Sequence, residues 1–218
     1  MPRIAAFVCR LGFLLGVAAL FAASAFAGPA AQPAADYAAL VAAAKNGQNV
    51  DFQALREAYV KSADYDPYGL KLPPAAREMI PAANAGDCQK AMKIARSVIE
   101  TAFIHADAHT ILALCADKAG DEAGEQAERK IAVGLMRSIF NSGDGKTPQT
   151  AYRVVTVWEE YSVLQLLKLR RTVQHLVSVD GHAYDVLDAK RDGQDKVESI
   201  YFRIDSILEQ LDRKLQPH

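Results

Sequence analysis

The stretch TVQHLVSVDGHAYDVLDA, residues 172–189, decides the fold. It consists of two runs in which apolar and polar residues alternate, and the dipeptide Asp180-Gly181 separates them. An Asp-Gly pair between alternating runs is the strongest short signal for a β-hairpin, because both turn residues must adopt positive φ. The sequence therefore predicts two antiparallel strands, 172–179 and 182–189, joined by a tight turn.

The residues around this hairpin predict the rest of a small antiparallel sheet with flanking helices. After a polar turn, residues 197–204 alternate again and predict a third strand, and Asp205 can cap a final helix. Before the hairpin, residues 152–157 are rich in β-formers and residues 159–170 follow a helical period. A sheet of three or four strands is therefore expected within residues 143–218.

Residues 36–142 predict helices only. Apolar residues recur at intervals of three and four from residue 37 onward, which is the period of a helix that buries one face. The proline-containing segment 65–74 interrupts this period, because proline withholds a backbone donor. We expect this segment to be an ordered loop that Tyr65 and Tyr68 anchor.

A spacing of 34 residues separates two Gly-Asp pairs, Gly86-Asp87 and Gly120-Asp121. This spacing is the period of the tetratricopeptide repeat, in which pairs of helices stack. Only about one and a half such repeats are visible, whereas a complete array needs three or more. We therefore expect helical hairpins of tetratricopeptide-like geometry, with helices at 107–118 and 121–140, and an α+β chain.

The first 27 residues have the layout of a signal peptide. Arg3 and Arg10 precede an apolar run, 11–21, and small residues around Ala27 offer a cleavage point. The alternative is a permanent membrane anchor, but the apolar run is shorter than the roughly 20 residues that a span requires. We expect cleavage after Ala27, a flexible lead-in at 28–35, and a mature protein in the periplasm or the medium, without stable membrane insertion.

The charge of the chain argues against nucleic acid as a partner. There are 25 Lys and Arg against 26 Asp and Glu, and loss of the two leader arginines gives the mature chain a formal charge of −3. A protein that binds nucleic acid through electrostatics instead carries a basic face or tail. We therefore expect no nucleic-acid partner.

Two cysteines, Cys88 and Cys115, remain after the predicted cleavage. An oxidising compartment favours a disulfide between a lone pair of thiols. Two antiparallel helices that reverse near Phe103 would bring these residues together. The alternative is two separately buried thiols, because free cysteine is often buried.

Two histidines four residues apart, His105 and His109, are weak candidates for a metal site. On one helix this spacing can direct two imidazoles at a metal, but a further ligand such as His175 or His182 would be needed. Structural histidines with hydrogen-bond partners are the preferred interpretation. We expect neither a metal nor a cofactor.

An acidic pair, Glu159-Glu160, provides the candidate chemistry of the sequence. With His182 or Asp185, these acids would form a catalytic His/carboxylate cluster. The alternative is structural, since acidic residues in the first turn of a helix complement the positive end of its dipole.

Six short motifs are distributed along the mature chain: Tyr65-Asp-Pro-Tyr-Gly69, His105-Ala-Asp-Ala-His109, Asp144-Gly-Lys-Thr-Pro148, Ala151-Tyr152, Glu159-Glu-Tyr161 and Asp180-Gly-His-Ala-Tyr-Asp-Val186. As a set they resemble the bacterial secreted family catalogued as domain of unknown function 4919, from about Asp51 to about Leu211. The resemblance implies an exported bacterial protein of helical and then mixed α/β character. It implies no activity, cofactor or partner.

Two hypotheses of function follow. The leading one is a non-enzymatic exported envelope protein that presents its helical hairpins to a protein or peptide partner, because the sequence carries no strong catalytic motif. The alternative is a hydrolase-like enzyme that uses His182 with Glu159, Glu160 or Asp185 in a cleft between helices and sheet. Convergence of these side chains in space would favour the enzyme.

Overall fold

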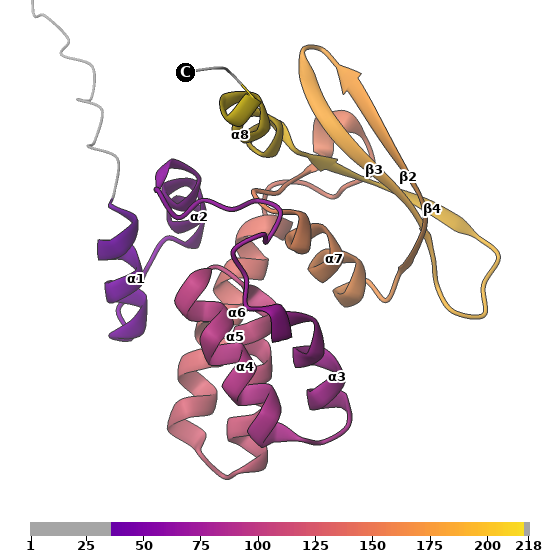
Figure 1. The fold of residues 1–218 in the computed structure, drawn as a ribbon. Coiled ribbons are helices and arrows are strands. Elements are labelled where there is room, and N and C mark those ends of the chain that lie inside the picture. Colours follow the sequence, from indigo (N-terminus) through magenta and orange to yellow (C-terminus); the bar gives the residue numbers. More distant parts are fainter. Residues whose placement is uncertain (1–35, 216–218) are drawn as a thin grey trace, which may run out of the picture. The chain divides into compact units, whose positions relative to one another are not determined.

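The structure, a computed structural model, describes residues 36–215. Most of the helices precede the sheet in the sequence, as the colours of Figure 1 show, and the sheet has four strands, so the predicted α+β fold class is confirmed. The predicted signal peptide at 1–27 and the lead-in at 28–35 lie outside the described residues.

The helical part contains short helices that pack against their neighbours in the sequence. Its elements are α1 (Tyr37–Lys45), α2 (Phe52–Lys61), the 3₁₀ helix η1 (Pro74–Glu78), α3 (Met79–Asn84), α4 (Cys88–Thr101), α5 (Ala106–Lys118) and α6 (Glu122–Phe140). Helix α3 packs against α4, α4 against α5, and α5 against α6. Consecutive antiparallel helices of this kind are the predicted helical hairpins.

The two Gly-Asp pairs have the same role at two helix junctions. Gly86 and Gly120 follow α3 and α5 with φ of 80° and 74°, a conformation that favours glycine. Asp87 and Asp121 then cap the next helices, since their Oδ1 atoms accept the amides of Lys90 and Gly124. The 34-residue spacing therefore marks repeated helix boundaries, and Asp121 precedes α6 instead of belonging to it.

The loop between α2 and η1 is anchored by one of the two predicted tyrosines. Tyr65 is buried, and its hydroxyl donates a hydrogen bond of 2.8 Å to the carbonyl of Val155. Tyr68, the other predicted anchor, is 42% exposed. The carbonyl of Pro67 accepts the amide of Val157, which fixes the loop beside the start of the next long helix.

The sheet contains β1 (Tyr152–Arg153), β2 (Arg170–Val179), β3 (His182–Lys190) and β4 (Val197–Arg203), in the order β1-β4-β3-β2. The pairs β2–β3 and β3–β4 are antiparallel, as predicted. Strand β1 is only two residues long and lies parallel to β4, so the sheet is mixed. The parallel pair forms because the chain enters beside β4, where the carbonyl of Gly145 accepts the amide of Tyr201.

The turn between β2 and β3 has the predicted conformation. Asp180 and Gly181 have φ of 51° and 78°, the two positive values that a two-residue hairpin of this type needs. Before the hairpin, helix α7 (Val157–Leu166) is shorter than the predicted helix 159–170. It ends early because Lys168 adopts a left-handed φ of 57°, which turns the chain into β2.

The residues of β3 alternate between the two sides of the sheet. Asp185, Leu187 and Ala189 lie on one side, where Leu187 and Ala189 are fully buried in the main core. Tyr184 and Val186 lie on the other side, in a smaller apolar cluster. We call the side that carries Leu187 and Ala189 the core side of the sheet. Helix α8 (Asp205–Leu215) follows β4.

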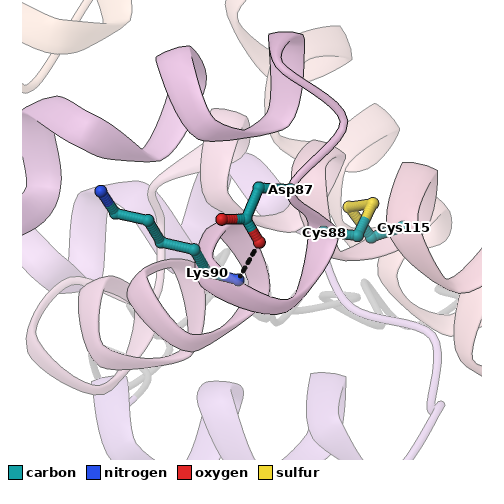
Figure 2. Close-up of a disulfide and its surroundings, with 4 residues drawn as sticks. All are labelled: Asp87, Cys88, Lys90 and Cys115. Carbon is teal, nitrogen blue, oxygen red and sulfur yellow. Dashed lines mark hydrogen bonds between the residues drawn. A yellow bond between two sulfur atoms is a disulfide. The ribbon is translucent and has the colours of Figure 1, made fainter.

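Cys88 and Cys115 meet where the sequence predicts. Cys88 begins α4 and Cys115 lies near the end of α5, and the chain reverses around Phe103 between the two helices. Figure 2 shows the two side chains joined, with Cα atoms 5.5 Å apart. This separation is in the usual range for disulfides, so the geometry permits the predicted bond.

Candidate functional site

Glu159, the first acid of the predicted cluster, is committed to a buried ion pair. Nε and Nη2 of Arg56 donate to its two carboxylate oxygens at 2.8 and 2.9 Å. The amide of Val155 donates to Oε2 at 2.8 Å. Both charged side chains are at most 4% exposed. Glu159 therefore joins α2 to α7, with both carboxylate oxygens already accepting hydrogen bonds.

The hydrogen-bond partners of His182 are Asp205 and Arg203, not the predicted partners Glu159, Glu160 and Asp185. Its Nδ1 is 3.0 Å from Oδ2 of Asp205, and the guanidinium of Arg203 lies 2.8 Å from the same nitrogen. Along β3, His182 and Asp185 are three residues apart, and alternation directs them to opposite sides of the sheet.

His105 and His109 have separate surroundings. The ring of His105 stacks on Trp158 with centroids 5.2 Å apart, and burial, together with the nearby His109, lowers the pKa of His105 to about 4. Nδ1 of His109 is 2.5 Å from Oε2 of Glu128, and its Nε2 is 2.7 Å from the carbonyl of Phe103. Within residues 36–215, no group of three or more His, Cys, Asp and Glu side chains is arranged to hold a metal.

Glu160 and Asp185 are the two predicted site residues that the structure brings together. Glu160 comes from the first turn of α7 and is 1% exposed, and Asp185 comes from the core side of β3 and is 8% exposed. Burial raises the pKa of Glu160 to about 9, and the neighbouring Asp185 and Glu159 add to this increase, while Arg171 opposes it. Glu160 is therefore protonated and neutral at pH 7.

A chain of polar and aromatic contacts extends from Asp185 toward the surface. Nε2 of Gln174 donates to Oδ2 of Asp185 at 2.7 Å, and Nη1 of Arg171 donates to Oε1 of Gln174 at 2.5 Å. The guanidinium of Arg171 in turn lies 5.5 Å from the centre of the Tyr161 ring. Arg171 is thus held by Gln174 and Tyr161.

Tyr68 completes this group of side chains from the loop after α2. Burial raises the pKa of its hydroxyl, and the neighbouring Asp185 and Glu160 add to the increase. Tyr68, which interacts with both acids, is 42% exposed, and Tyr161, which contacts Arg171, is 43% exposed; we call these two tyrosines the aromatic rim of the site. We call the six residues Tyr68, Glu160, Tyr161, Arg171, Gln174 and Asp185 the carboxyl site.

Strand β2 forms the outer border of this site. Its register pairs Leu176 with Asp185 and Gln174 with Leu187, so Gln174 and Leu176 also lie on the core side of the sheet. Leu176 is 66% exposed. Strand β2 stands last in the sheet order, and within residues 36–215 it has only β3 as a strand partner. An open backbone edge therefore lies next to the carboxyl site.

Four members of the carboxyl site were not predicted from the sequence: Tyr68, Tyr161, Arg171 and Gln174. Tyr161 adjoins Glu160 in the sequence, whereas the other three come from different segments than Glu160 and Asp185, and no short-range spacing connects them. One signal in the sequence could have indicated Gln174: alternation along β2 places this polar residue on the same side of the strand as the apolar residue Leu176.

A comparison of the amino-acid sequence with known protein families finds a matching family. Residues 46–213 match the model of a Domain of unknown function (DUF4919). The chain belongs to this family. The DUF4919 match covers the carboxyl site, the open edge of β2, Cys88 and Cys115, and it confirms the resemblance of the six motifs. Searches of curated proteins and of solved structures find no match. Among the helices within residues 36–215, none has the length and apolar character of a membrane span.

Proposed function

We propose that this DUF4919 protein is an exported envelope protein that binds an extended segment of a protein partner by adding it as a strand to β2. The observation that carries the proposal is the open edge of β2 beside the carboxyl site. In strand addition, main-chain hydrogen bonds provide affinity, and contacts with alternate side chains provide specificity. The edge and the carboxyl site supply these two components.

The register of the hairpin identifies the backbone groups that are available to a partner. Val179 and His182 flank the two-residue turn and form a hydrogen-bonded pair. Hydrogen-bonded and non-hydrogen-bonded pairs alternate along an antiparallel ladder. The amides and carbonyls of Gln174, Leu176 and Ser178 therefore point away from β3, toward an added strand.

Residues 174–179 of β2 lack the features that usually block strand addition at a sheet edge. Natural sheets protect their edges with charged residues, prolines, bulges or covering segments. In β2 the two arginines and the register shift are confined to the first residues, Arg170–Val173. Residues 174–179 contain no Lys, Arg, Asp, Glu or Pro. This stretch is suited to pairing with another strand.

The first prediction concerns the Leu176→Pro variant. Proline at this position removes an outward amide but no hydrogen bond to β3, and edge strands tolerate such prolines. Linear peptides selected from a display library on the wild-type protein should bind Leu176→Pro at least tenfold more weakly, as measured by fluorescence anisotropy. Leu176→Ser, which also loses the apolar side chain but keeps the amide, is the matched control and should bind within about threefold of the wild type.

Three outcomes would contradict strand addition of a peptide at this edge. One is that the library yields no binding peptide. Another is that Leu176→Pro, with unchanged circular dichroism, binds as well as Leu176→Ser. The third is that the wild-type protein sediments as a dimer that Leu176→Pro converts to a monomer, because the edge would then serve a second copy of the chain.

The second prediction concerns export. The order of charged, apolar and small residues in 1–27 supports cleavage after Ala27. The intact mass of protein recovered from the periplasm or the medium should correspond to a chain that begins at Gly28. Recovery of the full-length chain in the membrane fraction would refute the export proposal.

The hydrolase-like alternative has less support. It requires His182 to act with Glu159, Glu160 or Asp185, but the hydrogen bonds of His182 involve Asp205 and Arg203. Glu159 is neutralised by Arg56. Of the predicted catalytic residues, only Glu160 and Asp185 remain as neighbours. Two buried acids next to an open strand edge can bind a ligand, and binding requires no catalysis.

A further inference from the structure

An added strand would extend the sheet beyond β2, and the carboxyl site lies on the core side of this sheet. Residues paired across an antiparallel ladder share one side of the sheet. A residue of the partner opposite Leu176 or Gln174 would therefore have its side chain on the core side, together with Asp185. Two strand spacings of about 4.8 Å separate β3 from an added strand, a distance that long side chains can bridge.

The buried acids of this site have no direct counter-ion among the described side chains, those of residues 36–211. Oε1 of Glu160 is buried and accepts no hydrogen bond from any described residue. Asp185 accepts its hydrogen bond from a neutral amide, that of Gln174. Unpaired buried acids of this kind are stabilised by a cation, and in its absence one of them keeps its proton.

The titratable groups that interact with Glu160 come from β3, α7, β2 and the loop after α2. Asp185 approaches from β3 and Glu159 from α7, and both favour the protonated form of Glu160. Arg171 approaches from β2 and favours the ionised form, but its guanidinium is held by Gln174 and Tyr161. Tyr68 approaches from the loop after α2 as a neutral phenol. A ligand that brings one further positive charge would favour the ionised form of Glu160 over the protonated form.

The rim of the site is suited to the same ligand. Tyr68 and Tyr161 are both partly exposed; Tyr68 interacts with the two acids, and Tyr161 contacts Arg171. Aromatic faces attract ammonium and guanidinium groups, which keep favourable contacts there as they leave water. The rim and the acids would therefore bind opposite parts of one long cationic side chain.

Resting on the proposed strand addition, we infer that the carboxyl site binds a lysine or arginine side chain of the added segment, between Glu160, Asp185 and the two tyrosines. The cation binds the ionised form of Glu160, so binding releases the proton of this carboxyl group at neutral pH. Affinity for a basic peptide accordingly rises as the pH rises toward about 9, the pKa of free Glu160, and then levels.

The experiment compares two blocked peptides, acetyl-Thr-Val-Thr-Lys-Thr-Val-Thr-amide and the same peptide with norleucine in place of lysine. Isothermal titration calorimetry in two buffers of different ionisation enthalpy measures both affinity and proton release. The lysine peptide should bind the wild type at least tenfold more tightly and release close to one proton at pH 7. Glu160→Gln should abolish the preference and the proton release, whereas Glu122→Gln, at an exposed acid of α6, should change neither.

A second measurement tests the site without any peptide. The ¹³C resonance of the Glu160 carboxyl group is titrated in the presence of n-butylammonium, with n-butanol as the neutral control. Only the ammonium should lower the pKa of Glu160, by about one unit or more, which is a tenfold preference for the ionised form.

The outcomes separate the inference from the function on which it rests. Equal binding of the two peptides, with no proton release, would overturn the inference and leave strand addition intact. If neither peptide binds but n-butylammonium lowers the pKa of Glu160, the cation site stands and strand addition of these sequences fails. An unchanged pKa with n-butylammonium, together with equal peptide affinities, leaves no basis for a cation site.

Discussion

Replacing Arg56 by methionine should lower the free energy of unfolding by about 3 to 5 kcal/mol, the largest effect that we expect from one substitution. The substitution leaves the carboxylate of Glu159 buried at 2% exposure without its counter-ion. It also removes a hydrogen bond of 2.7 Å to the carbonyl of Arg153. Urea unfolding followed by circular dichroism measures the change.

The double variant Arg56→Met with Glu159→Gln provides the control. Glutamine removes the unpaired charge and can still accept the amide of Val155 through its side-chain oxygen. The double variant should therefore be more stable than Arg56→Met alone, although it contains one more substitution. A loss below about 1 kcal/mol for Arg56→Met, or a double variant less stable than the single one, would contradict the buried ion pair.

Loss of the predicted disulfide should lower the free energy of unfolding by about 3 kcal/mol. Cys88 and Cys115 are 27 residues apart in sequence. In the chain-entropy model, a bond that closes a loop of this size lowers the conformational entropy of the unfolded chain, and this loss stabilises the folded state by about that free energy. Cys88→Ala with Cys115→Ala should show the loss, and reduction of the wild type should produce a similar loss without any substitution.

Mass spectrometry decides whether the bond forms in the mature protein. Protein recovered from the periplasm or the medium is denatured and alkylated without reduction. No added alkyl group is expected for the mature chain, and two should be added after reduction. Two alkyl groups without prior reduction would mean that Cys88 and Cys115 are separately buried thiols.

Local sequence signals predicted those parts of the fold that depend on neighbouring residues. The dipeptide Asp180-Gly181 predicted its turn because few residue pairs adopt two positive φ values in succession. The pairs Gly86-Asp87 and Gly120-Asp121 predicted helical hairpins through their 34-residue spacing, and in the structure each pair acts locally, as a left-handed glycine and a capping side chain at a helix junction. Both signals act within a few residues.

Contacts between distant segments were beyond the reach of such signals. The parallel pairing of β1 depends on where the loop after α6 enters the sheet, and two residues carry too little pattern to indicate a direction. The end of α7 depends on Lys168, a residue type that seldom adopts positive φ.

The candidate site was partly predictable. Glu160 and Asp185 were among the predicted residues, and alternation along β3 already implied that His182 lies on the opposite side of the sheet from Asp185. Tyr68 and Gln174 join the site only through tertiary packing, since they lie on a loop and on a strand far from Glu160 in sequence.

Amide hydrogen exchange of β2 tests the central claim most directly. In the free protein the amides of Gln174, Leu176 and Ser178 should exchange quickly, because they point away from β3, while those of His175 and Val177 should be protected. Binding of a selected peptide should slow exchange at the three outward amides by at least tenfold and leave the two inward amides unchanged. Outward amides that exchange at the same rate in the free and the peptide-bound protein would contradict strand addition at this edge.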